Sequence, residues 1–311
     1  MVTFDRVEKT YPVALERGSV RALRGISFSL KHGEVVAYVG RNGAGKTTSL
    51  NILLGLIRAT GGSILLNGSP PEESHVRHHV GYLPERPYFY EQLTAVQFLH
   101  LMGKLSYMKS EDITARADDL LERLDIASVS NRKLRSFSRG MLQRLGIAQA
   151  MIHDPELLVL DEPLGGLDPM GRKLVRDVIM DARSAGKTVL YSSHILSDAE
   201  LIADRVVVID KGVILKDAPL DEYRKKSLGF VEVTLGPSST ITIDELAARW
   251  EAGKHSGGGF TVTVPEEKLQ QFIGTAISVG AMVREVCPPR ASLEDALVEL
   301  MDASVRNGGA R

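Results

Sequence analysis

At residues 40–47 the sequence reads Gly40-Arg41-Asn42-Gly43-Ala44-Gly45-Lys46-Thr47. This stretch has the spacing G-x-x-x-x-G-K-[ST] of a phosphate-binding loop. It follows an apolar run, Glu34–Val39, and precedes a stretch with helical character, 46–57, which is the strand–loop–helix context that the motif requires. Glycines let backbone N–H groups approach a phosphate, and a helix N-terminus adds free donors and partial positive charge. The loop therefore predicts a nucleotide site made by Gly40, Arg41, Asn42, Gly43, Ala44, Gly45, Lys46, Thr47 and Thr48.

Two side chains of the loop have predicted roles of their own. Lys46 is expected to reach the β- and γ-phosphates of ATP, and the Thr47 hydroxyl is expected to ligate Mg²⁺. ATP and Mg²⁺ are therefore the predicted cofactors.

Further apolar runs indicate the fold around this loop. Leu157–Leu160, Thr188–Tyr191 and Val206–Ile209 are short and apolar, and longer stretches with helical periodicity separate them. Short buried strands that alternate with helices predict an α/β fold with a largely parallel sheet. The stretch from about 87 to 153 has no comparable strand and indicates helices, so we expect a helical subdomain inserted into an α/β domain that spans 1–220.

The sequence after residue 220 predicts a second, smaller domain. The polar stretch LDEYRKKSLG at 220–229 predicts a linker over 221–229. Beyond it, alternating apolar residues predict short strands, and intervening periodic stretches predict helices. We expect an accessory α/β domain over 230–303 and a flexible tail over 304–311. The expected strands lie at 231–235, 260–264 and 282–286, and the expected helices at 244–250, 265–279 and 292–301.

Two acids end one of the predicted core strands. Asp161 and Glu162 follow the apolar run Leu157–Leu160, and ligands of open α/β folds bind at the carboxyl ends of parallel strands. Asp161 is expected to hold Mg²⁺ through water, and Glu162 to orient or deprotonate the attacking water. A strand that simply ends in solvated charges is the alternative. His194 follows another core strand and is a candidate contact of the γ-phosphate, although a lone histidine is more often structural.

Composition excludes several other classes. The 311 residues contain 38 Lys+Arg and 39 Asp+Glu, and the formal net charge of −1 gives no footprint for nucleic acid. A single cysteine, Cys287, cannot form an internal disulfide or a Cys-based zinc site. The N-terminal residues lack the apolar core of a signal peptide, and no segment approaches the roughly 20 apolar residues of a membrane-spanning helix. Any role at a membrane is therefore expected to act through a partner.

Taken in order, the motifs of residues 1–220 resemble those of the ATP-binding cassette (ABC) ATPases. The resemblance extends beyond the phosphate-binding loop and the acidic pair to five further features. They are a tyrosine where the family stacks an aromatic on adenine (Tyr11), a Q-loop (Gly81–Glu85), a signature motif (Phe137–Met141), a D-loop (Leu164–Pro169) and the switch histidine (His194).

The resemblance implies a homodimer that encloses ATP between its subunits. The signature of one subunit would face the phosphate-binding loop of the other, and Ser138 and the Gly140 backbone at a helix N-terminus would bind the phosphate held there. Arg139 takes the place of the usual third glycine of the signature, and Asp168 belongs to the D-loop that approaches the nucleotide.

Three further features depart from the family pattern or admit a second interpretation. The usual Q-loop glutamine is Glu85, whose carboxylate could still meet Mg²⁺ or water at a less favourable charge. Tyr11 precedes a stretch, 12–20, that looks like an insertion, so Tyr11 is either the adenine contact or a packing residue. The aromatics at 88–90 are expected either to meet the membrane subunit, as in the family, or to anchor the helical insertion.

The predicted function is ATP hydrolysis that energises a separate membrane permease. The single cassette, the signature and the short C-terminal extension resemble the ATPases of ABC-2-type exporters. This implies a cytoplasmic protein held on the inner face of the membrane by the permease. The alternatives are a non-transport ABC ATPase acting on ribosomes or DNA, which would carry two cassettes or a long coiled coil, and an ATP-dependent regulatory module, which would lack the acid after Asp161.

Overall fold

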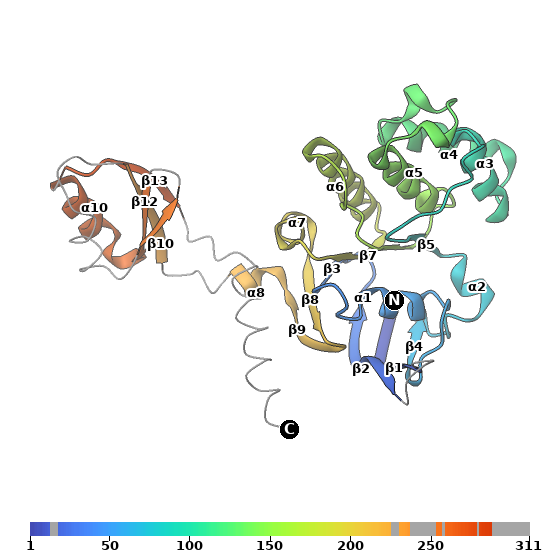
Figure 1. The fold of residues 1–311 in the computed structure, drawn as a ribbon, viewed down its shortest axis with the longest axis horizontal. Helices are drawn as coiled ribbons and strands as arrows, with labels where there is room; N and C mark the ends of the chain where they lie inside the picture. Colours follow the sequence, from blue (N-terminus) through green and yellow to red (C-terminus); the bar gives the residue numbers. More distant parts are fainter. Residues whose placement is uncertain (13–17, 225–229, 237–252, 257–258, 279, 288–311) are drawn as a thin grey trace. The chain divides into compact units, whose positions relative to one another are not determined.

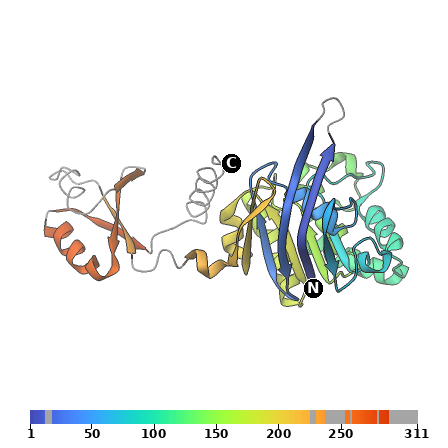
Figure 2. The same cartoon turned by 90° about the horizontal axis from the view of Figure 1, so that it is seen from below.

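The fold was analysed in a computed structural model, which describes residues 1–12, 18–224, 230–236, 253–256, 259–278 and 280–287 (Figures 1 and 2). The described residues fall into two compact units. The first is built from residues up to Leu220, and the second from the described residues of Asp221–Glu299.

A six-stranded sheet organises the first unit, with the strand order β5-β6-β7-β3-β8-β9. Five of the strands are parallel, and β9 pairs antiparallel with β8 at one edge. Four of these strands coincide with the apolar runs of the sequence, so the predicted α/β fold with a largely parallel sheet is confirmed. The strands are β3 (Val35–Val39), β5 (Val80–Leu83), β6 (Leu157–Leu160), β7 (Thr188–Ser193), β8 (Arg205–Asp210) and β9 (Val213–Pro219).

A second sheet of three antiparallel strands was not predicted. It has the order β2-β1-β4, with β1 at Val2–Pro12, β2 at Ser19–Leu30 and β4 at Gly61–Leu66. The alternation of β1 is interrupted by register shifts against both neighbours, and Arg6 has a positive φ of 47°. A bulged strand does not keep the period of two by which strands are found in a sequence.

The main core joins the two sheets. Phe4 of β1 stacks on Phe28 of β2 with ring centroids 4.2 Å apart, and Phe28 stacks on Tyr38 of β3 at 5.4 Å. Tyr38 is fully buried, and burial raises the pKa of its phenol well above the usual value. Its hydroxyl also lies 2.9 Å from the Ser49 hydroxyl of α1 (Lys46–Leu53). The strand before the phosphate-binding loop and the helix after it are thus fixed in one core.

Helix α1 is shorter than the stretch 46–57 that the sequence indicated. It ends at Leu53, and Gly55 follows with φ of +66°. A Cβ at Gly55 would lie 2.6 Å from the carbonyl oxygen of Pro71, so the chain turns where only glycine fits.

Between β5 and β6 the chain is helical, as its periodicity indicated. The first long helix of this region, α3, begins at a capping box in which the Thr94 hydroxyl and the Gln97 side chain bond each other's backbone N–H. This region holds the 3₁₀ turns 127–129 and 134–136 and the helices α3 (Ala95–Leu105), α4 (Ser110–Arg123) and α5 (Arg139–Met151). Elsewhere in the first unit are α2 (Ser74–Arg77), α6 (Pro169–Ser184) and α7 (Leu196–Ile202).

The aromatics after the Q-loop divide between the two interpretations. Phe89 is buried and meets Phe98 of α3 edge-on at 5.1 Å, so it anchors the helical region. Tyr88 and Tyr90 are exposed, at 86% and 53%. They remain available for a partner.

The predicted linker is partly helical. Residues Leu220–Arg224 form α8, and Leu220 and Tyr223 are buried. The polar composition of 220–229 hid this helix, because two apolar residues three positions apart suffice to bury one side of a single turn. Residues 225–229 lie outside the described part.

The second unit contains an antiparallel sheet with the order β11-β12-β10-β13. Helix α10 (Leu269–Ser278) packs on it through Phe272 and Ala276, and begins later than predicted, after a 3₁₀ turn at 266–268. The predicted strands are present, with β11 in addition, whereas the predicted helices at 244–250 and 292–301 and the tail lie outside the described residues. The strands are β10 (Phe230–Leu235), β11 (Gly253–Ser256), β12 (Gly259–Pro265) and β13 (Val283–Cys287).

Within the described ranges, no helix combines the length and the apolar character that crossing a membrane would need.

Candidate functional site

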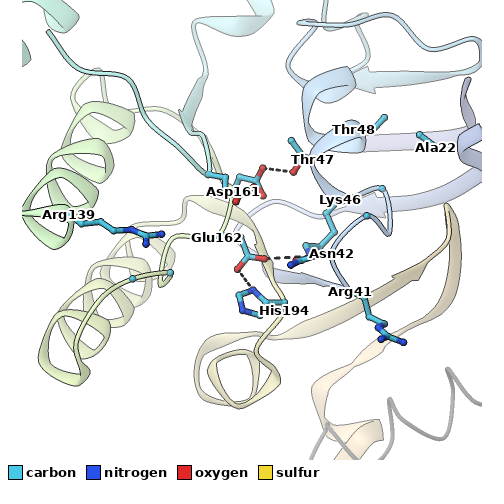
Figure 3. Close-up of a pocket in the computed structure, with 15 residues that line it drawn as sticks. Ala22, Arg41, Asn42, Lys46, Thr47, Thr48, Arg139, Asp161, Glu162 and His194 are labelled. Atoms are coloured by element: carbon cyan, nitrogen blue, oxygen red, sulfur yellow. Dashed lines mark hydrogen bonds and ion pairs between the residues drawn. The ribbon is translucent and has the colours of Figure 1, made fainter. Parts of the chain in front are cut away.

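A cavity of about 520 Å³ opens where β3, β6 and β7 end (Figure 3). These strands are neighbours in the sheet, and each is followed by one of the motifs found in the sequence. The cavity thus collects residues from the phosphate-binding loop, the acidic pair and the switch histidine. Its lining is Ala22, Arg41, Asn42, Gly43, Gly45, Lys46, Thr47, Thr48, Glu85, Arg139, Asp161, Glu162, Gly165, Gly166 and His194.

The loop between β3 and α1 depends on its first and last glycines. A Cβ at Gly40 would lie 2.3 Å from the Ile209 carbonyl oxygen of β8. Gly45 caps α1 with φ of 112°, and a Cβ there would lie 2.8 Å from Leu23. Neither position admits a side chain, so the loop keeps the tight path that turns its N–H groups towards the cavity.

Lys46 begins α1, and its side chain is nearly buried, at 7% exposure. The Nζ atom donates to the Gly40 carbonyl at 2.6 Å and lies 3.5 Å from Glu162 Oε1. The Lys46 ammonium group is therefore held at the floor of the loop, beside Glu162, which follows β6.

Thr47, the residue after Lys46, places its hydroxyl against the Asp161 carboxylate. Thr47 Oγ1 donates to Asp161 Oδ2 at 2.8 Å, and Ser192 Oγ donates to Asp161 Oδ1 at 2.5 Å. Asp161 is 1% exposed. Oxygen ligands of this kind suit Mg²⁺, so Thr47 and Asp161 fit the cation that the sequence predicted.

Glu162 sits in a sparsely populated backbone conformation, with φ of 52°. Its N–H donates to Ser192 Oγ at 2.9 Å, and its carbonyl accepts from the Gln143 amide at 3.2 Å. Its carboxylate lies between Lys46 and His194, whose Nδ1 is 2.8 Å from Oε2 (Figure 3). Strain of this kind concentrates at functional positions, where the surrounding structure fixes it.

A second wall of the cavity comes from outside the three strands. Glu85 follows β5, and Arg139 is the first residue of α5. Tyr82, three residues before Glu85, lies near the acidic pair, and burial together with the Asp161 carboxylate raises the pKa of Tyr82 to about 12.

Some predicted residues do not line this cavity. Tyr11 is 38% exposed on β1, with the Lys9 ammonium 5.0 Å from its ring centroid, so it is not a buried packing residue. Ser138 caps α5 by accepting from the Met141 N–H at 3.2 Å. Asp168 caps α6 by accepting from the Gly171 N–H at 2.8 Å. The remaining predicted residues absent from the lining are Gly40, Ala44 and Gly140.

Sequence reasoning missed two residues that brace the acidic pair. The Ser192 hydroxyl bonds both Asp161 and the Glu162 N–H. Gln143, 6% exposed on α5, donates to the carbonyls of Glu162 and Pro163. A serine at the end of a core strand was the available signal for the first, whereas a glutamine in an amphipathic helix gives none.

The parallel sheet, the glycine loop at a helix N-terminus and the Thr47–Asp161 contact define a P-loop nucleotide-binding domain. The ABC transporter family profile matches residues 23–165. An uncharacterised ABC transporter ATP-binding protein of Nostoc sp. (strain PCC 7120) is 37% identical over 285 residues, which cover 89% of this chain and 82% of that protein. The chain belongs to the ABC transporter family, as one of its ATP-binding proteins.

Two further proteins are informative. The daunorubicin resistance ATP-binding protein DrrA3 of Streptomyces coeruleorubidus is 37% identical over 230 residues, which cover 73% of this chain and 71% of that protein. A dimeric post-hydrolysis state of the ATP-binding cassette MJ0796, bound to ADP and Pi, has a TM-score of 0.66 and 25% identity, and covers 71% of this chain and 99% of that one.

Proposed function

We propose that this chain hydrolyses ATP, with Mg²⁺, to energise a separate membrane permease that exports its cargo. One observation carries the hydrolytic part of the proposal. The acid that ends β6, Glu162, lies between the lysine of the phosphate-binding loop and the switch histidine, within 3.5 Å of Lys46 Nζ and 2.8 Å of His194 Nδ1.

In the proposed reaction, a water oxygen forms a bond to the γ-phosphorus while the bond from that phosphorus to the β,γ-bridging oxygen breaks. Glu162 orients the water and accepts its proton, and His194 holds the Glu162 carboxylate and contacts the γ-phosphate. Lys46 neutralises charge on the β- and γ-phosphates. ADP leaves with the bridging oxygen, and inorganic phosphate with the water oxygen.

Thr47 and Asp161 are proposed to hold Mg²⁺. Glu85 lines the same cavity, and its carboxylate is proposed to meet the cation or a water bound to it. When bound, Mg²⁺ would neutralise negative charge on the phosphates. Ser192 orients Asp161, because it donates to one carboxylate oxygen and leaves the other for Thr47 and the cation.

A homodimer is proposed to complete the nucleotide site. The N-terminus of α5 carries Ser138 and Gly140, and neither lines the cavity of its own subunit. A phosphate held by a partner subunit would use these donors. Asp168 would approach the same interface, and Tyr11 would stack on adenine. The dimeric ADP-bound MJ0796 cassette, which shares the fold, supports this arrangement.

The transport part of the proposal rests on the family. Permease coupling is supported by membership of the ABC transporter family, and export by the similarity to a daunorubicin resistance protein. The exposed Tyr88 and Tyr90 are the proposed permease contact, since exposed aromatics are enriched at interfaces. The permease would hold the chain on the cytoplasmic face of the membrane.

The test compares Glu162→Gln with Glu156→Gln, which changes an exposed acid at the other end of the same strand. We expect the first variant to lose ATP turnover by a factor of about 100 or more while it still binds ATP, and the second to hydrolyse ATP normally. Lys46→Ala should weaken ATP binding. Normal turnover by Glu162→Gln would contradict the assignment of the base, and unchanged ATP affinity in Lys46→Ala would contradict the nucleotide site itself.

A further inference from the structure

The turn between β8 and β9 belongs to none of the motifs that the sequence revealed. Its hairpin lies at the edge of the six-stranded sheet, next to β2 (Figure 1). Asp210 pairs with Val213, so a two-residue turn, Lys211 and Gly212, joins the strands. Both turn residues have positive φ, at 46° and 79°. The central residues of such a turn lie outside the ladder, which leaves the N–H and C=O groups of Gly212 free for other partners.

Gly212 uses both groups to join the phosphate-binding loop to β2. Its N–H donates to the Ala44 carbonyl of the loop at 2.8 Å, and its own carbonyl accepts from the Arg24 N–H of β2 at 2.8 Å. The space around it is filled, because a Cβ at Gly212 would lie 2.5 Å from the Ala22 carbonyl oxygen. The turn therefore fits between the loop and β2 only with glycine at this position.

The contact with Ala44 determines the direction of a backbone donor of the loop. The Ala44 carbonyl and the Gly45 N–H belong to one peptide group, and in a planar trans peptide these two bonds point in opposite directions. Since the carbonyl points to Gly212, the Gly45 N–H points away from it. Gly45 lines the cavity, and its N–H bonds no acceptor within the part of the chain that the structure describes. This N–H is therefore available to a phosphate.

The two ends of the loop are held by different groups. At its start, the Gly40 N–H donates to the Ser193 carbonyl at 3.3 Å, and the Gly40 carbonyl accepts from Lys46 Nζ at 2.6 Å. Towards its end, the Ala44 carbonyl accepts from Gly212 and from no other residue among those described. The direction of the peptide group that follows Ala44 thus depends on the hairpin turn.

We propose that Gly212 is a positioning residue for nucleotide binding, which holds the Ala44 carbonyl so that the Gly45 N–H faces the phosphates. This inference rests on the proposed function, because it requires a nucleotide in the cavity. The N–H groups of a phosphate-binding loop cradle the α- and β-phosphates, which ATP and ADP share. Loss of the Gly212 contact therefore weakens both nucleotides alike. It leaves the turnover of bound ATP, which depends on Glu162, largely unchanged.

The first experiment measures the nucleotide dissociation constants and the ATPase kinetics of Gly212→Ala in the full chain. The new Cβ does not fit against Ala22, so the turn must shift and lose its 2.8 Å bond to the Ala44 carbonyl. We expect the affinities for ATP and ADP to fall roughly tenfold, as for the loss of one hydrogen bond to a charged group. KM for ATP should rise by a similar factor, while kcat changes by less than about twofold.

Gly186→Ala is the matched control. Gly186 has the same φ as Gly212, +79°, but a Cβ there would meet nothing within 4 Å. This variant introduces the same backbone strain into a turn away from the loop, so we expect it to bind nucleotides with wild-type affinity. Wild-type affinity in Gly212→Ala, or an equal loss of affinity in both variants, would overturn the proposal. Full nucleotide affinity in Lys46→Ala would instead refute the nucleotide site, and the proposal with it.

The second experiment uses the wild-type chain, so it does not depend on how a variant folds. It measures the hydrogen exchange of single amides by NMR, with and without saturating ADP. The N–H groups of Gly212 and Gly186 make backbone hydrogen bonds of equal length, 2.8 Å, to the carbonyls of Ala44 and Arg183. ADP that binds the Gly45 N–H fixes the peptide group to which Gly212 is bonded. We therefore expect several-fold slower exchange at Gly212 and little change at Gly186.

An unchanged exchange rate at Gly212, with slower exchange at the amides of the phosphate-binding loop, would overturn the proposal. Equal slowing at Gly212 and Gly186 would also overturn it, because that result reflects stabilisation of the whole unit by a bound ligand. Unchanged exchange throughout the loop would refute the nucleotide site itself.

Discussion

Ser192→Ala should destabilise the first unit although the residue has no proposed contact with ATP. Its hydroxyl donates to Asp161 Oδ1 at 2.5 Å and accepts from the Glu162 N–H at 2.9 Å, and both Ser192 and Asp161 are almost fully buried. Alanine removes both bonds and leaves a buried carboxylate oxygen and a partly buried N–H without this partner. A hydrogen bond to a charged group contributes about 1.5–3 kcal/mol and a neutral one about 1 kcal/mol, so we expect a loss of about 3 kcal/mol.

The assay is chemical denaturation of the nucleotide-free full chain, followed by circular dichroism. In thermal unfolding of the same chain, a loss of 3 kcal/mol from a unit of this size corresponds to a fall in melting temperature of roughly 6–12 °C. Ser193→Ala is the matched control, because its hydroxyl bonds only the backbone of Ile195, two residues on. We expect it to cost about 1 kcal/mol or less. The reasoning is refuted if Ser192→Ala unfolds at the wild-type denaturant concentration, or if both variants lose the same stability.

Three further changes test other parts of the first unit. Burial lowers the pKa of His153, so the folded state binds fewer protons there than the unfolded one; stability should fall as the pH drops below about 6.5, and His153→Gln should flatten this part of the profile in pH-dependent denaturation. Arg205→Met should cost about 3 kcal/mol in denaturation, since it leaves the largely buried Glu34 without its cation. Gly81→Ala should abolish soluble expression, because its Cβ would lie 1.9 Å from the Ala150 carbonyl oxygen.

A different result would contradict each of these three predictions. A profile for His153→Gln parallel to wild type from pH 7.5 to 5.5 would assign the acid sensitivity to other groups. Arg205→Met with wild-type stability would show that water solvates Glu34 as well as the arginine does. Gly81→Ala that folds normally would show that α5 can move away from β5 at little cost.

Sequence reasoning predicted the fold best where the residue pattern of one segment determines the structure of that same segment. Val35–Val39 is a buried strand because all five residues are apolar, and the loop after it is recognised by glycines whose necessity is local. Asp161 and Thr47 were assigned to one cation, and they are bonded to each other although 114 positions separate them. Parallel-sheet topology explains this proximity, because parallel strands of one sheet end at the same edge.

The failures have equally specific causes. The antiparallel sheet was missed because β1 is bulged, and α8 was missed because its polar composition resembles a linker. Gln143 could not be found from the sequence, because its contact with Glu162 depends on how α5 packs against the end of β6. The position of Arg139, the first residue of α5, against Gly166 is likewise a contact between two segments that only the folded chain brings together.

The positive φ of Glu162 has a consequence for how this protein evolves. A residue other than glycine or asparagine costs about 1 kcal/mol in this conformation, so the backbone there opposes the acid that turnover needs. Selection for heat resistance alone would favour glycine or asparagine at position 162, and selection for ATP turnover would restore glutamate. A lineage released from hydrolysis would therefore lose this acid early and become more thermostable as it lost its activity.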